Sequence, residues 1–143
     1  MDDELSLSGK LKAIDKLLDE FQETLDKETW KSAMKPGEME YNVGKRFCDE
    51  QKMELAMRAF SVAVEKGHVR AMVCLGKIYS KGNNMMKAFP LFLKAAELGD
   101  ITAMNNTATC YTLGLGTNKN LGEAEEWKRK YQEAKKAKAA VKP

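Results

Sequence analysis

The chain has little of what metal sites and catalytic centres need. It contains one histidine, His68, and three cysteines, Cys48, Cys74 and Cys110, among 143 residues. The cysteines are too far apart for a CxxC metal site, and their odd, sparse number argues against a disulfide framework. A single imidazole leaves no second histidine to complete a metal cluster. We therefore expect no metal, no cofactor and no catalytic residue, and we do not expect an enzyme.

Long apolar runs and a strong charge imbalance are also missing. The start, MDDELSLSGK, is acidic where a secretory signal would be basic and then apolar. The longest run without a charged residue, 101–118, carries threonines and asparagines throughout, which a bilayer would leave unsatisfied. The net charge of +3 is too small to favour nucleic acid. These features predict a soluble, cytoplasmic protein without membrane contact.

A repeat of 32 residues is what the sequence does contain. Shifting the chain by 32 residues places identical residues together at Gly44 and Gly76, Ala56 and Ala88, Phe60 and Phe92, Ala63 and Ala95, Gly67 and Gly99, Ala71 and Ala103, Met72 and Met104, and Tyr79 and Tyr111. The matches keep one register over two units, which chance does not explain. Repeats of this length indicate stacked structural units that share a core.

Each unit has the pattern of two helices joined by a turn. Apolar residues recur three and four positions apart in both halves of a unit, as an amphipathic helix requires. Gly67 and Gly99 follow helical runs, where a left-handed residue ends a helix. Asp100 then stands where a side-chain oxygen caps the next helix, and His68 occupies that place one unit earlier. We expect Gly76 to let two helix backbones approach closely.

The segments RAMVCLGKIYSKG and KAFPLFLKAAELGD resemble the Sel1-like repeat, a branch of the tetratricopeptide-like solenoids. The third unit adds that family's longer turn at Gly114 and Gly116, but replaces Leu75-Gly76 by Thr107-Ala108. The resemblance covers about residues 38–134. It implies an all-α fold: a short right-handed α-solenoid of about three helix-turn-helix repeats, preceded by a helical arm.

This organisation divides the chain into three parts. Residues 1–36 form an amphipathic helix, residues 37–134 form three repeats (about 38–68, 69–100 and 101–134), and residues 135–143 form a lysine-rich tail. The tail is either a solvated helix end or a surface that binds RNA or phosphate.

The N-terminal helix carries one apolar stripe: Leu11, Ile14, Leu18, Phe21 and Leu25. One interpretation is that this stripe packs over the first repeat. The other is an arm that binds a partner helix or a second copy of the chain, since the spacing resembles heptads.

In tetratricopeptide-like solenoids the first helix of each pair lines a concave groove, and the resemblance implies the same here. The residues then expected in the groove are Tyr41, Lys45, Arg70, Val73, Lys77, Thr102, Asn105 and Thr109. Three of them are cations, and Asn105 can hold a peptide backbone. We therefore predict a non-catalytic protein-interaction module, an adaptor or small subunit that binds an acidic or extended peptide, or a helix. The alternative is an RNA- or phosphate-binding accessory protein that uses the lysine-rich end.

Overall fold

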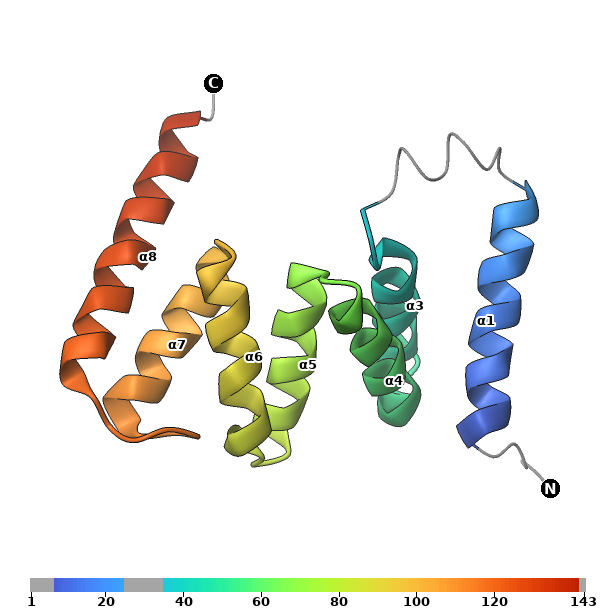
Figure 1. Cartoon of the computed structure of the whole chain (residues 1–143), viewed down its shortest axis with the longest axis horizontal. Coiled ribbons are helices and arrows are strands. Elements are labelled where there is room, and N and C mark those ends of the chain that lie inside the picture. Colours follow the sequence, from blue (N-terminus) through green and yellow to red (C-terminus); the bar gives the residue numbers. More distant parts are fainter. Residues whose placement is uncertain (1–6, 25–34, 142–143) are drawn as a thin grey trace. The chain divides into compact units, whose positions relative to one another are not determined.

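The computed structural model describes residues 7–24 and 35–141. Within these ranges the regular elements are all α-helices, with no strand (Figure 1). They are α1 Leu7–Thr24, α3 Glu38–Asp49, α4 Met53–Glu65, α5 Val69–Lys81, α6 Met85–Glu97, α7 Ile101–Leu113 and α8 Leu121–Val141. The predicted all-α fold class is confirmed, and three pairs of helices follow the first helix along the chain.

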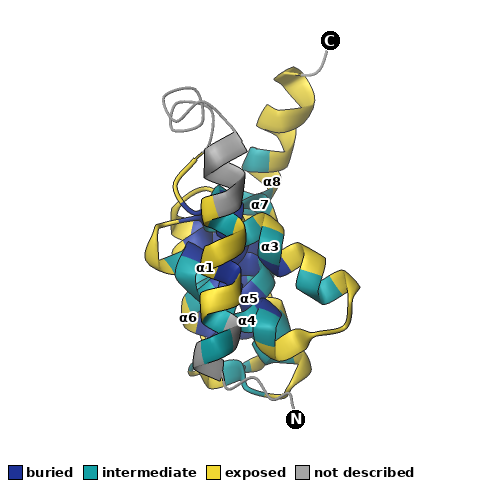
Figure 2. Cartoon of the chain, turned by 90° about the vertical axis from the view of Figure 1, so that its right-hand side faces the viewer, coloured by how far each residue is buried: buried dark blue, intermediate teal, exposed yellow. Residues whose placement is uncertain are grey.

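The chain divides into two compact units, residues 1–71 and 72–143. Unit 1 contains α1, α3, α4 and the first turn of α5. Unit 2 contains the rest of α5 together with α6, α7 and α8. In the helix pairs the buried residues form stripes, and the opposite faces are exposed (Figure 2).

Helices α4 and α6 end in the same way. Gly67 and Gly99 have φ angles of 84° and 98°, which glycine adopts without the steric penalty of a Cβ. The N–H groups of Gly67 and His68 bond back to last-turn carbonyls of α4 at 2.8 and 3.0 Å. Gly99 and Asp100 repeat both bonds on α6, at 3.0 Å each. This is the Schellman arrangement, and it confirms the helix ends predicted at both glycines.

Side chains cap the helices that follow. Asp100 accepts the Ala103 N–H at 2.9 Å at the start of α7, as the sequence predicted. Asparagines take the same role elsewhere: Asn84 accepts from Lys87 at 3.3 Å and Asn120 accepts from Glu123 at 3.1 Å. Each such bond satisfies one of the N–H groups that a helix start leaves without a partner.

The turns inside the first two helix pairs use residues other than glycine in the left-handed region. Gln51 after α3 has φ 61°, and Asn83 after α5 has φ 60°. Asparagine adopts this conformation more readily than most residues, but glutamine gives no such signal. The sequence predicts a turn between the two helices of each unit, but it does not identify these left-handed residues.

A glycine lies against a phenylalanine ring in each of the first two pairs. A Cβ on Gly44 would lie 2.6 Å from the Phe60 ring, and a Cβ on Gly76 would lie 2.7 Å from the Phe92 ring. Both rings are buried. The Phe92 ring of α6 therefore lies directly against Gly76 of α5, and the same contact recurs 32 residues earlier. The approach of two helix backbones expected at Gly76 stays a prediction.

The longer turn of the third pair also depends on a close approach. Gly114 and Gly116 have φ angles of 73° and 71°. A Cβ on Gly116 would lie only 2.1 Å from the Met85 carbonyl oxygen. The turn therefore lies directly against the start of α6, and a side chain at position 116 would push it away.

Gly76→Ala tests the glycine–ring contact. We expect the free energy of unfolding to fall by about 1–2 kcal/mol, because overpacking outweighs the gain in helix propensity. Gly82→Ala is the control, since the nearest atom to its Cβ would be 3.6 Å away. Urea unfolding followed by circular dichroism measures both. Equal stability of the two variants would show that Phe92 moves aside without cost.

The third pair contains a buried hydroxyl at the position that Leu75 holds one unit earlier. Thr107 is 0% exposed. Its Oγ1 has no hydrogen-bond partner among the described residues. A buried polar group without a partner costs stability that an apolar group of the same shape does not.

Thr107→Val is therefore expected to raise the free energy of unfolding by about 1 kcal/mol. Thr109→Val is the matched control, because Thr109 is exposed and its hydroxyl donates to the Asn105 carbonyl at 3.1 Å. Its effect should stay within about 0.5 kcal/mol. Thermal unfolding compares the two, and a lower melting temperature for the Thr107 variant would contradict the argument.

Candidate functional site

The predicted groove residues divide between the two units. In unit 1, Lys45 and Arg70 are exposed and Tyr41 is half-buried. The Lys45 ammonium lies 5.0 Å from the centre of the Tyr41 ring, within the range of a cation–π contact. In unit 2, four of the predicted residues are exposed: Lys77, Thr102, Asn105 and Thr109.

Val73 is the exception, because it is 0% exposed. The prediction that its side chain faces the groove is wrong. From Ala71 to Gly76 every residue of α5 except Cys74 is buried. The buried residues therefore extend around more of the helix than a single amphipathic stripe would. A short side chain on such a helix lies in the core, whereas the longer Arg70 and Lys77 reach solvent.

Unit 1 has a pocket of about 390 Å³ where the start of α3 meets the turn between α4 and α5. It brings together two predicted groove residues, Tyr41 and Arg70. The other lining residues are Lys35, Pro36, Glu38, Lys66, Gly67, His68 and Val69. Three of the lining side chains are cations and one is a carboxylate. We name this the joint pocket.

His68 forms the floor of the joint pocket and is 7% exposed. Its Nδ1 accepts the Ala71 N–H at 3.1 Å, which caps α5 as Asp100 caps α7. Because Nδ1 accepts, the proton of the neutral ring is on Nε2, which lies 2.5 Å from Glu38 Oε1. The ring stacks on Tyr41, with centres 4.5 Å apart. Both nitrogens are engaged, so this imidazole is not available as a metal ligand or a general base.

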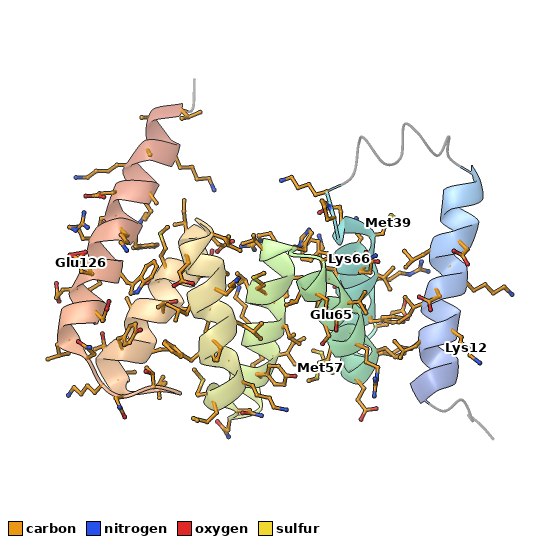
Figure 3. All side chains as sticks on the ribbon, viewed as in Figure 1. Lys12, Met39, Met57, Glu65, Lys66 and Glu126 are labelled. Atoms are coloured by element: carbon orange, nitrogen blue, oxygen red, sulfur yellow. The ribbon has the colours of Figure 1, made fainter. Side chains whose placement is uncertain are left out.

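The carboxylates around the joint pocket have partners. Glu38 bonds His68, and the buried Glu40 forms an ion pair with Lys66. In Figure 3, Lys66 lies near the start of α3, where Met39 is labelled. Lys35 and Arg70 add positive charge at the rim. The pocket therefore has cations at its edge, and the carboxylates near its base are held by His68 and Lys66.

Unit 2 has a second pocket, of about 470 Å³, between the start of α7 and the second half of α8. Thr102 and Asn105 of the predicted groove line it. Lys135 and Lys138 line it as well, although the sequence analysis placed them in a separate tail. Residues 135–141 continue α8 without a break. We name this the α7–α8 pocket.

The apolar stripe of α1 is partly buried within unit 1, where α1 contacts α4. Ile14 is 4% exposed, and Leu11 and Leu18 are half-buried. A pocket of about 390 Å³ separates Leu17 and Leu18 from Met39, Val43 and Phe47 of α3. Two more residues were predicted for this interface. The side chain of Phe21 is not among those that the structure describes, and Leu25 lies outside the described residues. Self-association through this helix stays a prediction.

Metal-ligating side chains, thiols and helix hydropathy bear on other kinds of site. No group of three or more histidine, cysteine, aspartate or glutamate side chains comes together there as a metal site would require. The three cysteines are free thiols, and burial raises the pKa of Cys110. None of the described helices is long and apolar enough to cross a membrane.

No family model matches this chain, but it is similar to known proteins. A Sel1-like repeat-containing protein of Schizosaccharomyces pombe is 31% identical over 86 residues, which is 60% of this chain and 13% of the yeast protein. The crystal structure of a Sel1 repeat protein from Oxalobacter formigenes matches 72% of this chain with a TM-score of 0.66 and 28% identity. The chain resembles these Sel1-like repeat proteins in sequence and in fold. The expected solenoid fold class is thereby confirmed.

The chain spans less than half of either relative: 13% of the yeast protein and 46% of the bacterial one. The turns that follow α4 and α6 have the same backbone hydrogen bonds but differ in one side chain. Position 68 is histidine, and the matching position 100 is aspartate. Both cap the next helix, but only the histidine also contacts Glu38 and Tyr41.

His68→Ala and His68→Asn separate these two roles. Alanine removes the cap and should lower the free energy of unfolding by about 2 kcal/mol. Asparagine keeps an oxygen that can accept the Ala71 N–H, so it should recover about 1 kcal/mol of that loss. Urea midpoints measure the difference. If asparagine is no better than alanine, the cap contributes little and the contacts with Glu38 and Tyr41 dominate.

Proposed function

We propose that this chain is a non-catalytic protein-interaction module, an adaptor or small subunit, that binds an acidic, extended peptide segment of another protein. The binding residues are Tyr41, Lys45, Arg70, Lys77, Thr102, Asn105 and Thr109, the predicted groove residues without Val73. Sel1-like repeats generally mediate protein–protein interaction, which supports the class of function.

The joint pocket is the observation that carries the proposal. Its rim is basic and its wall is aromatic, and the nearby carboxylates of Glu38 and Glu40 are already engaged by His68 and Lys66. An incoming carboxylate therefore meets cations rather than unpaired acids. Tyr41 and His68 supply a rigid stacked surface for contact. Charge of this kind increases the association rate and selects acidic partners.

The exposed predicted residues of unit 2 also offer a positive charge and hydrogen-bonding groups to a peptide. Lys77 adds a cation, and Asn105 offers both a donor and an acceptor to a peptide backbone. These residues lie on α5 and α7, the first helices of their pairs. The proposed contacts in unit 2 therefore lie on first helices and not on α6.

Lys45→Glu combined with Lys77→Glu tests the proposal. A partner is first captured with the full chain from native lysate and purified, and its affinity is then measured. We expect the double reversal to weaken binding by at least about fivefold, since it replaces attraction by repulsion. Lys52→Glu with Lys94→Glu is the control. It makes the same change in net charge at exposed lysines outside the proposed surface.

A loss of less than about twofold for the first pair would overturn the proposal, because charges at such an interface should matter more than that. A loss that is equal for both pairs would also overturn it, since overall charge would then explain the binding. Recovery of nucleic acid instead of protein, released by salt, would favour the alternative function through the lysine-rich end of α8.

A further inference from the structure

The α7–α8 pocket has a composition that the first half of the chain does not share. Thr102 and Asn105 come from α7, and Tyr131, Lys135 and Lys138 come from α8, with apolar atoms from Ile101 and Ala139. The charged lining residues are both cations. The pocket thus has two ammonium groups, hydrogen-bonding side chains and a small apolar wall.

The second half of α8 contributes to this pocket rather than to the core. Helix α8 has 21 residues and α7 has 13, a difference of about 12 Å at 1.5 Å per residue. Ala124 and Trp127 are the buried residues of α8, and every residue from Lys135 to Val141 is exposed. Figure 2 shows the end of α8 as exposed surface. Burial in the core therefore does not explain why the helix continues.

Two acidic residues of α8 form ion pairs with Arg129, which does not line this pocket. Glu126 and Glu133 bond Arg129 at 3.0 and 2.7 Å, and the bond from Arg129 lowers the pKa of Glu126. Glu126 is on the side of α8 turned away from α7 (Figure 3). The sequence places no acid three or four positions from Lys135 or Lys138, so neither has an ion-pair partner within its own helix.

The pocket is also partly ordered by its own contacts. The Lys135 ammonium lies 5.2 Å from the centre of the Tyr131 ring, which orients this lysine along the α8 wall. A carboxylate between Lys135 and Lys138 would gain charge-assisted hydrogen bonds. The aliphatic part of the same side chain would contact Ile101 or Ala139. Glutamate and aspartate have this combination of a short apolar stem and a carboxylate.

We propose that the α7–α8 pocket binds an acidic side chain of the partner peptide, with Lys135 and Lys138 pairing its carboxylate and Asn105 bonding the adjacent backbone. This rests on the proposed function and names the residue type that the peptide carries at its contact with unit 2. Lys135 and Lys138 lie three residues apart on one helix, so both can pair with one carboxylate. A run of nucleic-acid phosphates needs a continuous track of cations.

The test uses fluorescein-labelled octaglutamate and the full chain, with binding followed by fluorescence anisotropy. Lys135→Glu with Lys138→Glu should weaken binding by at least about fivefold. Lys130→Glu with Lys136→Glu is the matched control on the same helix, with the same change in net charge and no residue in the pocket. It should weaken binding by less than about twofold. Circular dichroism verifies that all variants remain helical.

Asn105→Ala provides a second test that leaves the charge unchanged. We expect it to weaken octaglutamate binding by about threefold through the lost backbone hydrogen bond. In a nuclear magnetic resonance titration of the unmodified chain, the amide signals of Thr102, Asn105 and Lys135 should shift together on addition of octaglutamate. Shifts confined to other residues would overturn the assignment.

The remaining outcomes distinguish this site from the proposed function. If Lys45→Glu with Lys77→Glu weakens octaglutamate binding and the Lys135 and Lys138 reversal does not, the proposed function stands and this pocket is overturned. If neither reversal matters, or octaglutamate does not bind, both fail. Equal losses for the two α8 pairs would indicate overall charge and overturn the site. Tighter binding of octauridylate than of octaglutamate would overturn it in favour of RNA.

Discussion

The contact between a helical glycine and a phenylalanine ring sets the spacing of the first two helix pairs. Gly44 faces Phe60, and Gly76 faces Phe92, at distances that leave no room for a Cβ. Helices that approach this closely bury small residues along their common face, and the alanines of α4 and α6 are accordingly buried. The remaining faces are then free to carry charge, which is where most of the proposed binding residues lie.

The joint after α4 uses one residue for stability and for the shape of a pocket. His68 caps α5 through Nδ1 and contacts Glu38 and Tyr41 through the rest of its ring. Asp100 caps α7 in the same way but places a carboxylate at the matching position. The conserved requirement of the two joints is therefore an acceptor for one N–H group. The chemistry beyond that acceptor can differ from joint to joint.

Internal pairing explains how a chain with a net charge of +3 presents basic surfaces. In unit 1 the carboxylates of Glu38 and Glu40 are engaged by His68 and Lys66. In unit 2 those of Glu126 and Glu133 are engaged by Arg129. The acids are thus drawn into short-range contacts, while lysines line the two pockets. The net charge of the chain does not reveal these basic surfaces, because it adds the paired carboxylates to the lysines that line the pockets.

The sequence by itself determined the all-α class, the pairing of helices within a repeat and the helix boundaries at Gly67, Gly99 and Asp100. These features depend on local physics: apolar spacing, left-handed glycines at positions 67 and 99, and the cap at Asp100. It also named Gly76 as a small residue between two helices, but only the structure shows that the Phe92 ring lies against it. The tertiary structure decided which side chains reach solvent and which residues meet. Val73 is buried because α5 is enclosed around more than one face. Asn105 lines one pocket with Lys135 and Lys138 because the second half of α8 continues past the buried residues of that helix. Such arrangements bring together residues about 30 positions apart in the chain. A local sequence pattern cannot predict them, because it describes only residues a few positions apart.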